Sequence, residues 1–96
     1  MISKKTINAI ELCVLLAGQR GQGYLTTSDL SPRLDLSISY LENILKQLKE
    51  SGIVVSMKGP GGGYRIQGDV SLVSIWDVAA VFEQTMADTE QDRKSV

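Results

Sequence analysis

The fold is decided by residues 37–64, whose sequence is SISYLENILKQLKESGIVVSMKGPGGGY. The first half has the apolar spacing of a helix, with a stripe formed by Leu41, Ile44, Leu45 and Leu48. Ser37 can cap this helix, and Gly52 can end it. Residues 53–58 predict a strand and residues 64–67 a return strand, joined by a glycine-rich loop at residues 59–63. The stretch therefore predicts a helix followed directly by a β-hairpin.

Two further helices are predicted before this stretch. The first covers residues 3–17 with Ser3 as its cap, and we expect a buried stripe of Ile7, Ile10, Val14 and Ala17, with Cys13 beside it. The second begins at Thr26 or Thr27, because Thr26 and Asp29 have the spacing of a capping box.

Two residues decide how the second helix ends. Pro32 leaves two alternatives, a short helix distorted at the proline or a separate turn that starts at Ser31. Asp35 follows in a connector, where aspartate tolerates the left-handed backbone conformation that such turns often need.

A fourth helix is predicted after the hairpin. Ser74 and Asp77 resemble a capping box, and the expected apolar stripe consists of Ile75, Val78, Ala79, Phe82 and Met86. Residues 87–96 are polar and form either a frayed tail or a truncated dimerisation helix that packs on a partner. We expect residues 1–86 to form one domain.

The composition excludes most enzyme chemistry. The chain has one cysteine and no histidine, so Ser-His and Cys-His nucleophile pairs and histidine-containing metal sites are excluded. The carboxylates are scattered along the sequence and form no catalytic pair, so we expect no enzyme. Cys13 has apolar neighbours, which is typical of a core residue. No apolar run is long enough to span a bilayer and no signal-peptide cleavage site is evident, so we expect a soluble, cytoplasmic protein.

The order helix, short helix, helix, hairpin, helix predicts a mostly α fold with a β-hairpin, a winged helix-turn-helix. In that fold the third helix lies in the major groove of DNA, with its first residues against base edges. The net charge is −1, but residues 1–68 carry eight Lys or Arg and five Asp or Glu. The segment expected to face DNA is therefore positive.

The third helix has suitable side chains opposite its apolar stripe. Ser39, Asn43 and Lys46 lie on that face, with Tyr40 and Glu42 on its flanks. A serine hydroxyl can contact base edges or phosphate, a tyrosine can donate to a phosphate oxygen, and a glutamate can accept from cytosine N4. We expect Ser39, Tyr40, Glu42 and Asn43 to determine which DNA sequence is bound, and Lys46 to contact phosphate.

Helix ends and lysines supply the expected phosphate contacts. The second and third helices begin near Thr27 and Ser37, where backbone N–H groups can bind a phosphate. Lys4 and Lys5 lie in the first turn of the first helix, where they either stay exposed at a small cost or meet a DNA phosphate.

The glycine-rich tip has two interpretations. It resembles a nucleotide-binding loop only superficially, because a P-loop requires Gly-Lys-Ser/Thr at the start of a helix and a strand follows here. The glycines can simply serve a turn with positive φ. Alternatively, a tip that begins with Gly59 and is flanked by Lys58 and Arg65 enters a DNA minor groove.

Two motifs in this order and spacing, SISYLE at residues 37–42 and KGPGGGY at residues 58–64, resemble the Rrf2 family of bacterial winged-helix regulators. The resemblance covers residues 2–83. It implies a homodimeric transcription regulator, which we expect to be a repressor, bound to a palindromic operator in double-stranded DNA.

The resemblance also implies site residues. It assigns DNA reading to Ser39 and Tyr40, a recognition-helix role to Glu42, and the basic position of the wing to Lys58. Many relatives have arginine at that last position, and lysine keeps the charge but lacks the planar guanidinium, so groove reading is expected to be weaker.

The chain departs from the family pattern at several positions. Cluster-binding members carry cysteines after the fourth helix and this chain has none there, so we expect no iron–sulfur cluster and no other cofactor. The family usually continues through a long dimerisation helix, whereas this chain stops at Val96. Ile7 stands where many relatives have a basic residue, and Pro32 and Asp35 stand where a helix former and a glycine are usual.

The leading hypothesis is a sequence-specific DNA-binding transcription regulator. The alternative is a truncated, DNA-binding-deficient relative that pairs with a full-length regulator, an alternative motivated by the acidic residues 69–96. A redox role for Cys13 is less favoured, because apolar flanks predict an inert thiol.

Overall fold

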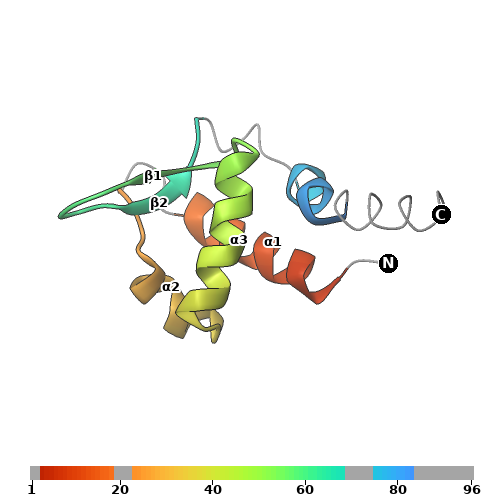
Figure 1. The fold of residues 1–96 in the computed structure, drawn as a ribbon, viewed down its shortest axis with the longest axis horizontal. Helices are drawn as coiled ribbons and strands as arrows, with labels where there is room; N and C mark the ends of the chain where they lie inside the picture. The colour runs from red at the N-terminus through yellow and green to blue at the C-terminus, as the bar shows by residue number, and fades with distance from the viewer. Residues whose placement is uncertain (1–2, 19–22, 69–74, 84–96) are drawn as a thin grey trace, which may run out of the picture.

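The computed structural model describes residues 3–18, 23–68 and 75–83. Figure 1 shows that α3 crosses in front of α1 and that α2 lies beside the start of α3, with the hairpin on one side. The elements are α1 (Lys4–Ala17), α2 (Thr27–Leu34), α3 (Ile38–Glu50), β1 (Val54–Met57) and β2 (Gly63–Ile66), and residues 75–83 form a further helix. The predicted mostly helical fold with a β-hairpin is confirmed.

Helix α2 begins and ends as its local sequence dictates. Thr26 is its cap: the Thr26 hydroxyl accepts from the backbone N–H of Asp29 at 3.0 Å, and the Asp29 carboxylate accepts from the N–H of Thr26 at 3.0 Å. The helix runs through Pro32 to Leu34, so the alternative of a separate turn at Ser31 is wrong. Asp35 then takes the left-handed conformation, with φ of 56°, as predicted.

Helix α3 has a cap at both ends. The Ser37 hydroxyl accepts from the backbone N–H of Tyr40 at 3.1 Å. At the other end Gly52 has a φ of 81°, and the N–H groups of Gly52 and Ile53 donate to the carbonyls of Lys49 and Leu48. The predicted apolar stripe is fully buried, with no exposed surface on Leu41, Ile44, Leu45 or Leu48. The α2–α3 unit is therefore fixed largely by local signals.

Helix α1 buries only part of the predicted stripe: Cys13 is buried, and Ile10 and Ala17 are partly buried against the core. Ile7 and Val14 are 49% and 62% exposed, so their assignment to the core is wrong. The buried apolar residues of this helix are Ala9, Leu12, Cys13 and Leu16. Both sets have the three- and four-residue spacing of a helix stripe, and contact with the other helices and the hairpin selects one of them. The predicted cap, Ser3, is confirmed by its hydrogen bond from the N–H of Thr6.

The first strand of the hairpin is shorter than predicted, and the second is shifted by one residue. Residues 53 and 58 lie outside β1, and β2 begins one residue early, at Gly63. The strands pair in an antiparallel register with Val54 opposite Ile66, which places both buried side chains against the core. On the other side of β2, Leu25 forms a bridge with Tyr64.

Steric crowding explains why glycine occupies the hairpin tip. A Cβ at Gly62 would collide with the backbone carbonyl of Met57, and Gly63, with a φ of 137°, lies against the carbonyl of Leu25. The interpretation of these glycines as a turn requirement is confirmed at Gly59, Gly61 and Gly63, which all have positive φ.

The helix at residues 75–83 packs one side on the core. Val78, Ala79 and Phe82 are buried as predicted, but Ile75 is exposed, so its place in the stripe is wrong. The predicted cap Ser74, the stripe residue Met86 and the tail at residues 87–96 lie outside the described residues. Of the helices that the structure describes, none has the length and apolar character needed to cross a membrane.

Candidate nucleic-acid interface

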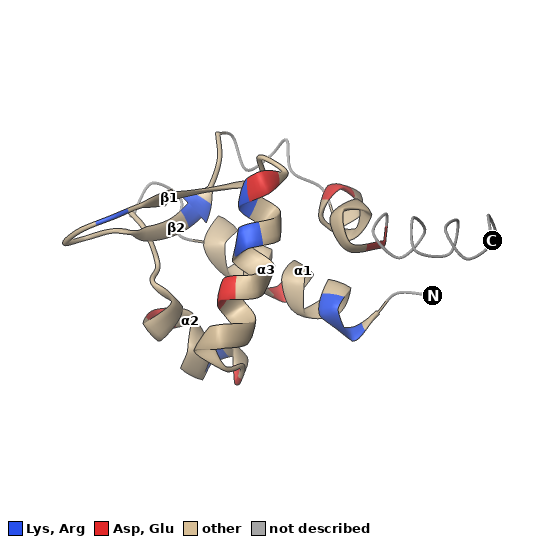
Figure 2. Ribbon diagram, in the orientation of Figure 1, with Lys and Arg blue, Asp and Glu red and all other residues tan. Residues whose placement is uncertain are grey.

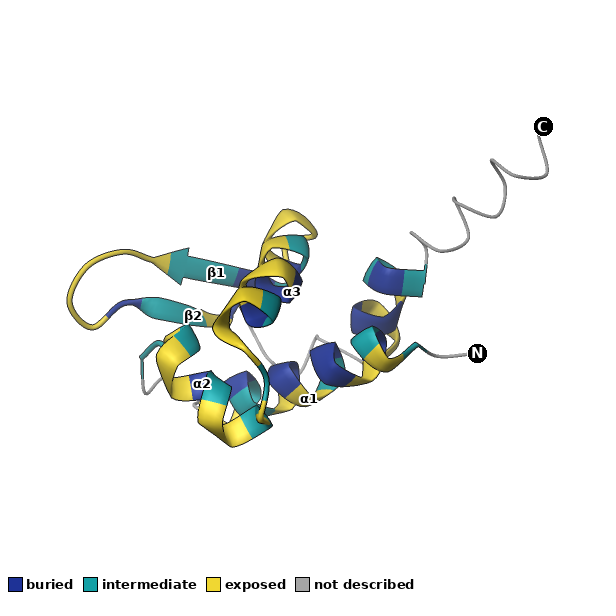
Figure 3. Cartoon of the chain, turned by 60° about the horizontal axis from the view of Figure 1, so that its bottom comes forward, coloured by how far each residue is buried: buried dark blue, intermediate teal, exposed yellow. Residues whose placement is uncertain are grey.

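The outer face of α3 is polar and open to solvent. Ser39, Glu42, Asn43 and Lys46 are all exposed, on the side opposite the buried stripe. The Asn43 side-chain oxygen accepts a hydrogen bond from the Gln47 amide at 3.0 Å, which orients Asn43 along the helix. Figure 3 shows the exposed residues of α3 and the exposed tip of the hairpin. The structure thus keeps these four side chains available to a ligand.

Tyr40 differs from its neighbours because it is half-buried and packs against the core. Its hydroxyl accepts a hydrogen bond from the side-chain amide of Asn8, in α1, at 3.1 Å. Asn8 is only 8% exposed. The structure therefore holds Tyr40 between two helices, whereas Ser39, Glu42 and Asn43 project into solvent.

The hairpin presents two cations in different settings. Lys58 and Gly59 are exposed at the start of the tip. Arg65 is exposed on β2, where its guanidinium lies 5.1 Å from the ring centroid of Tyr24. The bridge between Leu25 and Tyr64 brings Tyr24 opposite Arg65. Lys58 is therefore an exposed charge at the tip, whereas Arg65 lies over an aromatic ring.

The N-termini of α2 and α3 differ as anion sites. Thr27, the first residue of α2, is half-buried, and the Asp29 carboxylate lies in the same turn. Hydrogen bonds from the backbone and side chain of Thr26 lower the pKa of Asp29, so this helix end already carries a negative charge at neutral pH. The first turn of α3 after Ser37 contains no acidic residue. A phosphate would therefore meet less repulsion at Ser37 than at Thr27.

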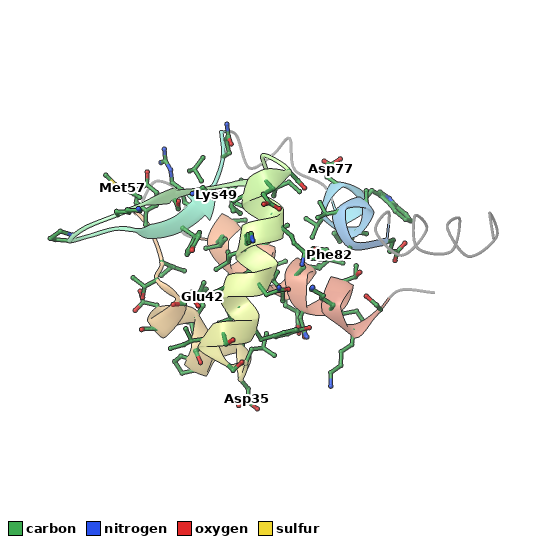
Figure 4. All side chains as sticks on the ribbon, in the orientation of Figure 1. Asp35, Glu42, Lys49, Met57, Asp77 and Phe82 are labelled. Carbon is green, nitrogen blue, oxygen red and sulfur yellow. The ribbon has the colours of Figure 1, made fainter. Side chains whose placement is uncertain are left out.

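The two lysines of α1 lie far from the hairpin. Figure 2 shows the blue start of α1 and the blue segment of the hairpin at opposite sides of the molecule. Lys4 is exposed, but Lys5 is half-buried with its amine 5.7 Å from the ring centroid of Phe82. Figure 4 shows Phe82 on the helix at residues 75–83, close to the start of α1. The structure brings together the α3 residues, but not Lys4 and Lys5 with the hairpin cations.

Two residues of the site were not predicted from the sequence, Asn8 and Tyr24. Asn8 carries a weak signal, because a polar side chain on an apolar helix face needs a hydrogen-bond partner when it is buried. Tyr24 carries no such signal, since its proximity to Arg65 depends on the bridge formed by the next residue.

Cys13 and the carboxylates that the structure describes do not form a cluster of metal ligands. Cys13 is buried, and burial raises the pKa of its thiol to about 12, so the metal-binding thiolate is strongly disfavoured. Over the described ranges no three Asp, Glu or Cys residues come together as possible ligands. With one cysteine and no histidine in the sequence, the residues present do not match the donor set of an iron–sulfur cluster.

Curated relatives match most of this chain. IscR of Vibrio vulnificus (strain YJ016), an HTH-type transcriptional regulator, is 40% identical over 63 residues, which are 66% of this chain and 38% of the relative. IscR of Vibrio cholerae is 37% identical over 73 residues, 76% of this chain and 42% of the relative. The chain thus spans less than half the length of these relatives.

Solved structures share the fold. CymR, described as the global cysteine regulator of B. subtilis, superposes with a TM-score of 0.83 at 28% identity over 86% of this chain and 64% of CymR. IscR of T. potens superposes with a TM-score of 0.80 at 26% identity over 99% of this chain and 75% of that one. Together with the helix order and the hairpin, these neighbours confirm the winged helix-turn-helix fold.

The family profile that matches residues 2–96 is Rrf2, described as "Iron-dependent Transcriptional regulator". The match covers both motifs singled out in the sequence, SISYLE and KGPGGGY, and the helices that carry and support them. The chain belongs to the Rrf2 family of transcriptional regulators.

Proposed function

We propose that this chain is a sequence-specific DNA-binding repressor that uses no iron–sulfur cluster. The observation that carries the proposal is the polar face of α3, where Ser39, Glu42, Asn43 and Lys46 are exposed together while the opposite face is fully buried. A major groove of DNA admits one α-helix, and these side chains have the donors and acceptors that base edges require. The protein acts on the bacterial chromosome and therefore in the cytoplasm, and it is not an enzyme.

Phosphate contacts provide the affinity in this proposal. The N-terminus of α3 at Ser37, the amine of Lys46 and the hairpin residues Lys58, Gly59 and Arg65 supply them. Thr27, Lys4 and Lys5 have smaller roles, because Asp29 repels a phosphate at Thr27 and the two lysines lie away from the hairpin. The affinity therefore falls steeply as the salt concentration rises.

A homodimer on a palindromic operator completes the proposal. Trp76 is 79% exposed, and Ile7 and Val14 on α1 are also open to solvent. Exposed apolar side chains of this size favour a protein–protein contact. The same observation favours the alternative function, in which the chain pairs with a longer regulator and blocks it. Sedimentation of the chain alone and mixed with a full-length Rrf2 relative distinguishes the two, because only the alternative requires stable heterodimers without DNA binding.

The test is selection of duplexes from a random-sequence pool, followed by gel-shift titration at several salt concentrations. We expect a defined consensus for the wild-type chain. We expect Lys58→Ala to weaken all duplexes alike and to reduce the slope of log affinity against log salt by about 1. Glu42→Ala instead relaxes the preference at one base position, at a cost of about 1–3 kcal/mol of discrimination.

Lys49→Ala is the matched control. Lys49 is exposed on the last turn of α3, so its loss changes the net charge equally without removing a proposed contact. Equal salt slopes for Lys49→Ala and Lys58→Ala would refute the role of the hairpin lysine. Failure of the wild-type chain to enrich any sequence would refute the function.

A further inference from the structure

We propose that Asn8 is a positioning residue that aims the hydroxyl of Tyr40 at DNA, an inference that rests on the proposed function. Asn8 lies on α1, is almost fully buried, and donates its side-chain N–H to the Tyr40 oxygen at 3.1 Å. It belongs to neither the exposed face of α3 nor the hairpin. Its influence on DNA binding therefore passes entirely through Tyr40.

The direction of this hydrogen bond determines what Tyr40 can do. A tyrosine hydroxyl has one hydrogen to donate and lone pairs that accept. Because the Tyr40 oxygen accepts from Asn8, its own hydrogen remains for an external acceptor. A phosphate oxygen or a base acceptor is the ligand group that this donor fits.

Tyr40 is also held at its backbone and at its ring. Its N–H donates to the hydroxyl of Ser37 at 3.1 Å, and its ring packs against the core. With Asn8 holding the oxygen, the side chain is ordered before DNA arrives. A donor fixed in this way loses less conformational entropy on binding than a mobile one.

Three substitutions distinguish a role of Asn8 in positioning Tyr40 from a role only in the packing of α1 on α3. Asn8→Leu removes the donor and keeps a similar volume. Asn8→Asp keeps the shape but replaces the donor with an acceptor, so Tyr40 turns its hydrogen inward and loses it for DNA. Tyr40→Phe removes the hydroxyl, and each Asn8 variant is made in both the wild-type and the Tyr40→Phe backgrounds.

The measurement is the gel-shift affinity for the best duplex selected by the wild-type chain, together with the urea midpoint of each variant. We expect Asn8→Leu to weaken binding about threefold to tenfold, the range of one hydrogen bond. Asn8→Asp weakens it further although its hydrogen bond to Tyr40 persists. In the Tyr40→Phe background Asn8→Leu has no further effect on affinity, and Asn8→Asp retains only the part that is due to its charge.

Two outcomes overturn the assignment while leaving the function intact. One is an Asn8→Leu effect on affinity that is equally large in the Tyr40→Phe background. The other is unchanged affinity in both Asn8 variants while Glu42→Ala still alters the selected sequence. If Asn8→Leu does not fold, the affinities of the isosteric Asn8→Asp variant in the wild-type and Tyr40→Phe backgrounds still decide whether Asn8 acts through Tyr40. A wild-type chain that selects no duplex overturns both the function and the role of Asn8.

Discussion

Helices α1 and α3 are 14 and 13 residues long, yet their sequences specify their buried faces very differently. In α3 the four apolar residues from Leu41 to Leu48 form one stripe with polar residues opposite, and this stripe is the buried face. In α1 apolar residues occupy most of the circumference, and the face that contains Ile7 and Val14 is left exposed. A helix with one apolar face orients itself by its own sequence, whereas α1 takes its orientation from the elements that pack on it.

The largest expected effect tests the assignment of the buried face in α1. Leu12 has no exposed surface, so Leu12→Ala creates a cavity and lowers the free energy of unfolding by about 2–5 kcal/mol. Val14→Ala, two residues away on the exposed side, changes it by less than about 0.5 kcal/mol. Urea unfolding followed by circular dichroism gives both values.

The control for this comparison is Leu45→Ala in α3, where sequence and structure agree on burial. Leu45→Ala should lower the free energy of unfolding by as much as Leu12→Ala does. A cost for Val14→Ala close to that of Leu12→Ala would contradict the buried face of α1 as described. If a Leu→Ala variant does not fold, Leu12→Met, which keeps most of the volume, should cost less than about 1.5 kcal/mol.

A smaller effect compares the serine caps of the two helices. Ser3 and Ser37 each accept one backbone N–H at 3.1 Å, so Ser37→Ala should cost about 1 kcal/mol of stability. Ser3→Ala should cost more, because the Ser3 hydroxyl also shares a hydrogen bond of 3.0 Å with the buried Thr6 hydroxyl. Their effects on DNA affinity should differ. Ser37→Ala weakens binding several-fold because Ser37 starts the helix proposed to enter the groove, whereas Ser3→Ala leaves it unchanged.

The DNA affinity of both variants is measured under conditions in which both are fully folded, and circular dichroism checks this. Equal losses of affinity in the two cap variants would mean that general destabilisation accounts for the effect, and the special role of the α3 N-terminus would be abandoned.

The parts of the fold that sequence predicted are those set by neighbouring residues. The Thr26–Asp29 box, the left-handed Asp35 and the C-terminal Gly52 each act over a few positions, so their residue types alone reveal them. The exposed face of α3 followed for the same reason. The hydrogen bond from Asn8 to Tyr40 spans 32 positions, and no spacing rule relates two helices over that distance.

The contact of Arg65 with Tyr24 was missed for a related reason. This contact depends on the β-bridge between Leu25 and Tyr64, and the residue types around Leu25 do not predict that bridge. The error in α1 has the same origin, because two stripes of equal helical spacing compete and only packing decides between them. Long-range contacts thus account for what the sequence left open, both in the core and in the candidate site.

The smallest expected effect concerns the charge that distinguishes the N-terminus of α2 from that of α3. Hydrogen bonds from the backbone and side chain of Thr26, with a smaller contribution from Arg33, lower the pKa of Asp29 in the folded chain. The unfolded chain therefore binds a proton more readily at this position than the folded chain. The contribution of Asp29 to stability is present above its unfolded pKa, about 3.9, and is lost as the pH falls through the lower folded value.

Asp29→Asn isolates this contribution, because asparagine keeps the shape and does not titrate. The difference in urea midpoint between the wild-type chain and Asp29→Asn should be largest near pH 6 and should shrink as the pH approaches 3, since protonation then removes the same charge from the wild type. A difference that stays constant over this range would show that the Asp29 charge does not stabilise α2. Removing that charge should also make the start of α2 more attractive to phosphate, so Asp29→Asn is expected to bind the selected duplex slightly more tightly at neutral pH. This gain would bring the α2 N-terminus closer to that of α3, where no carboxylate stands in the first turn.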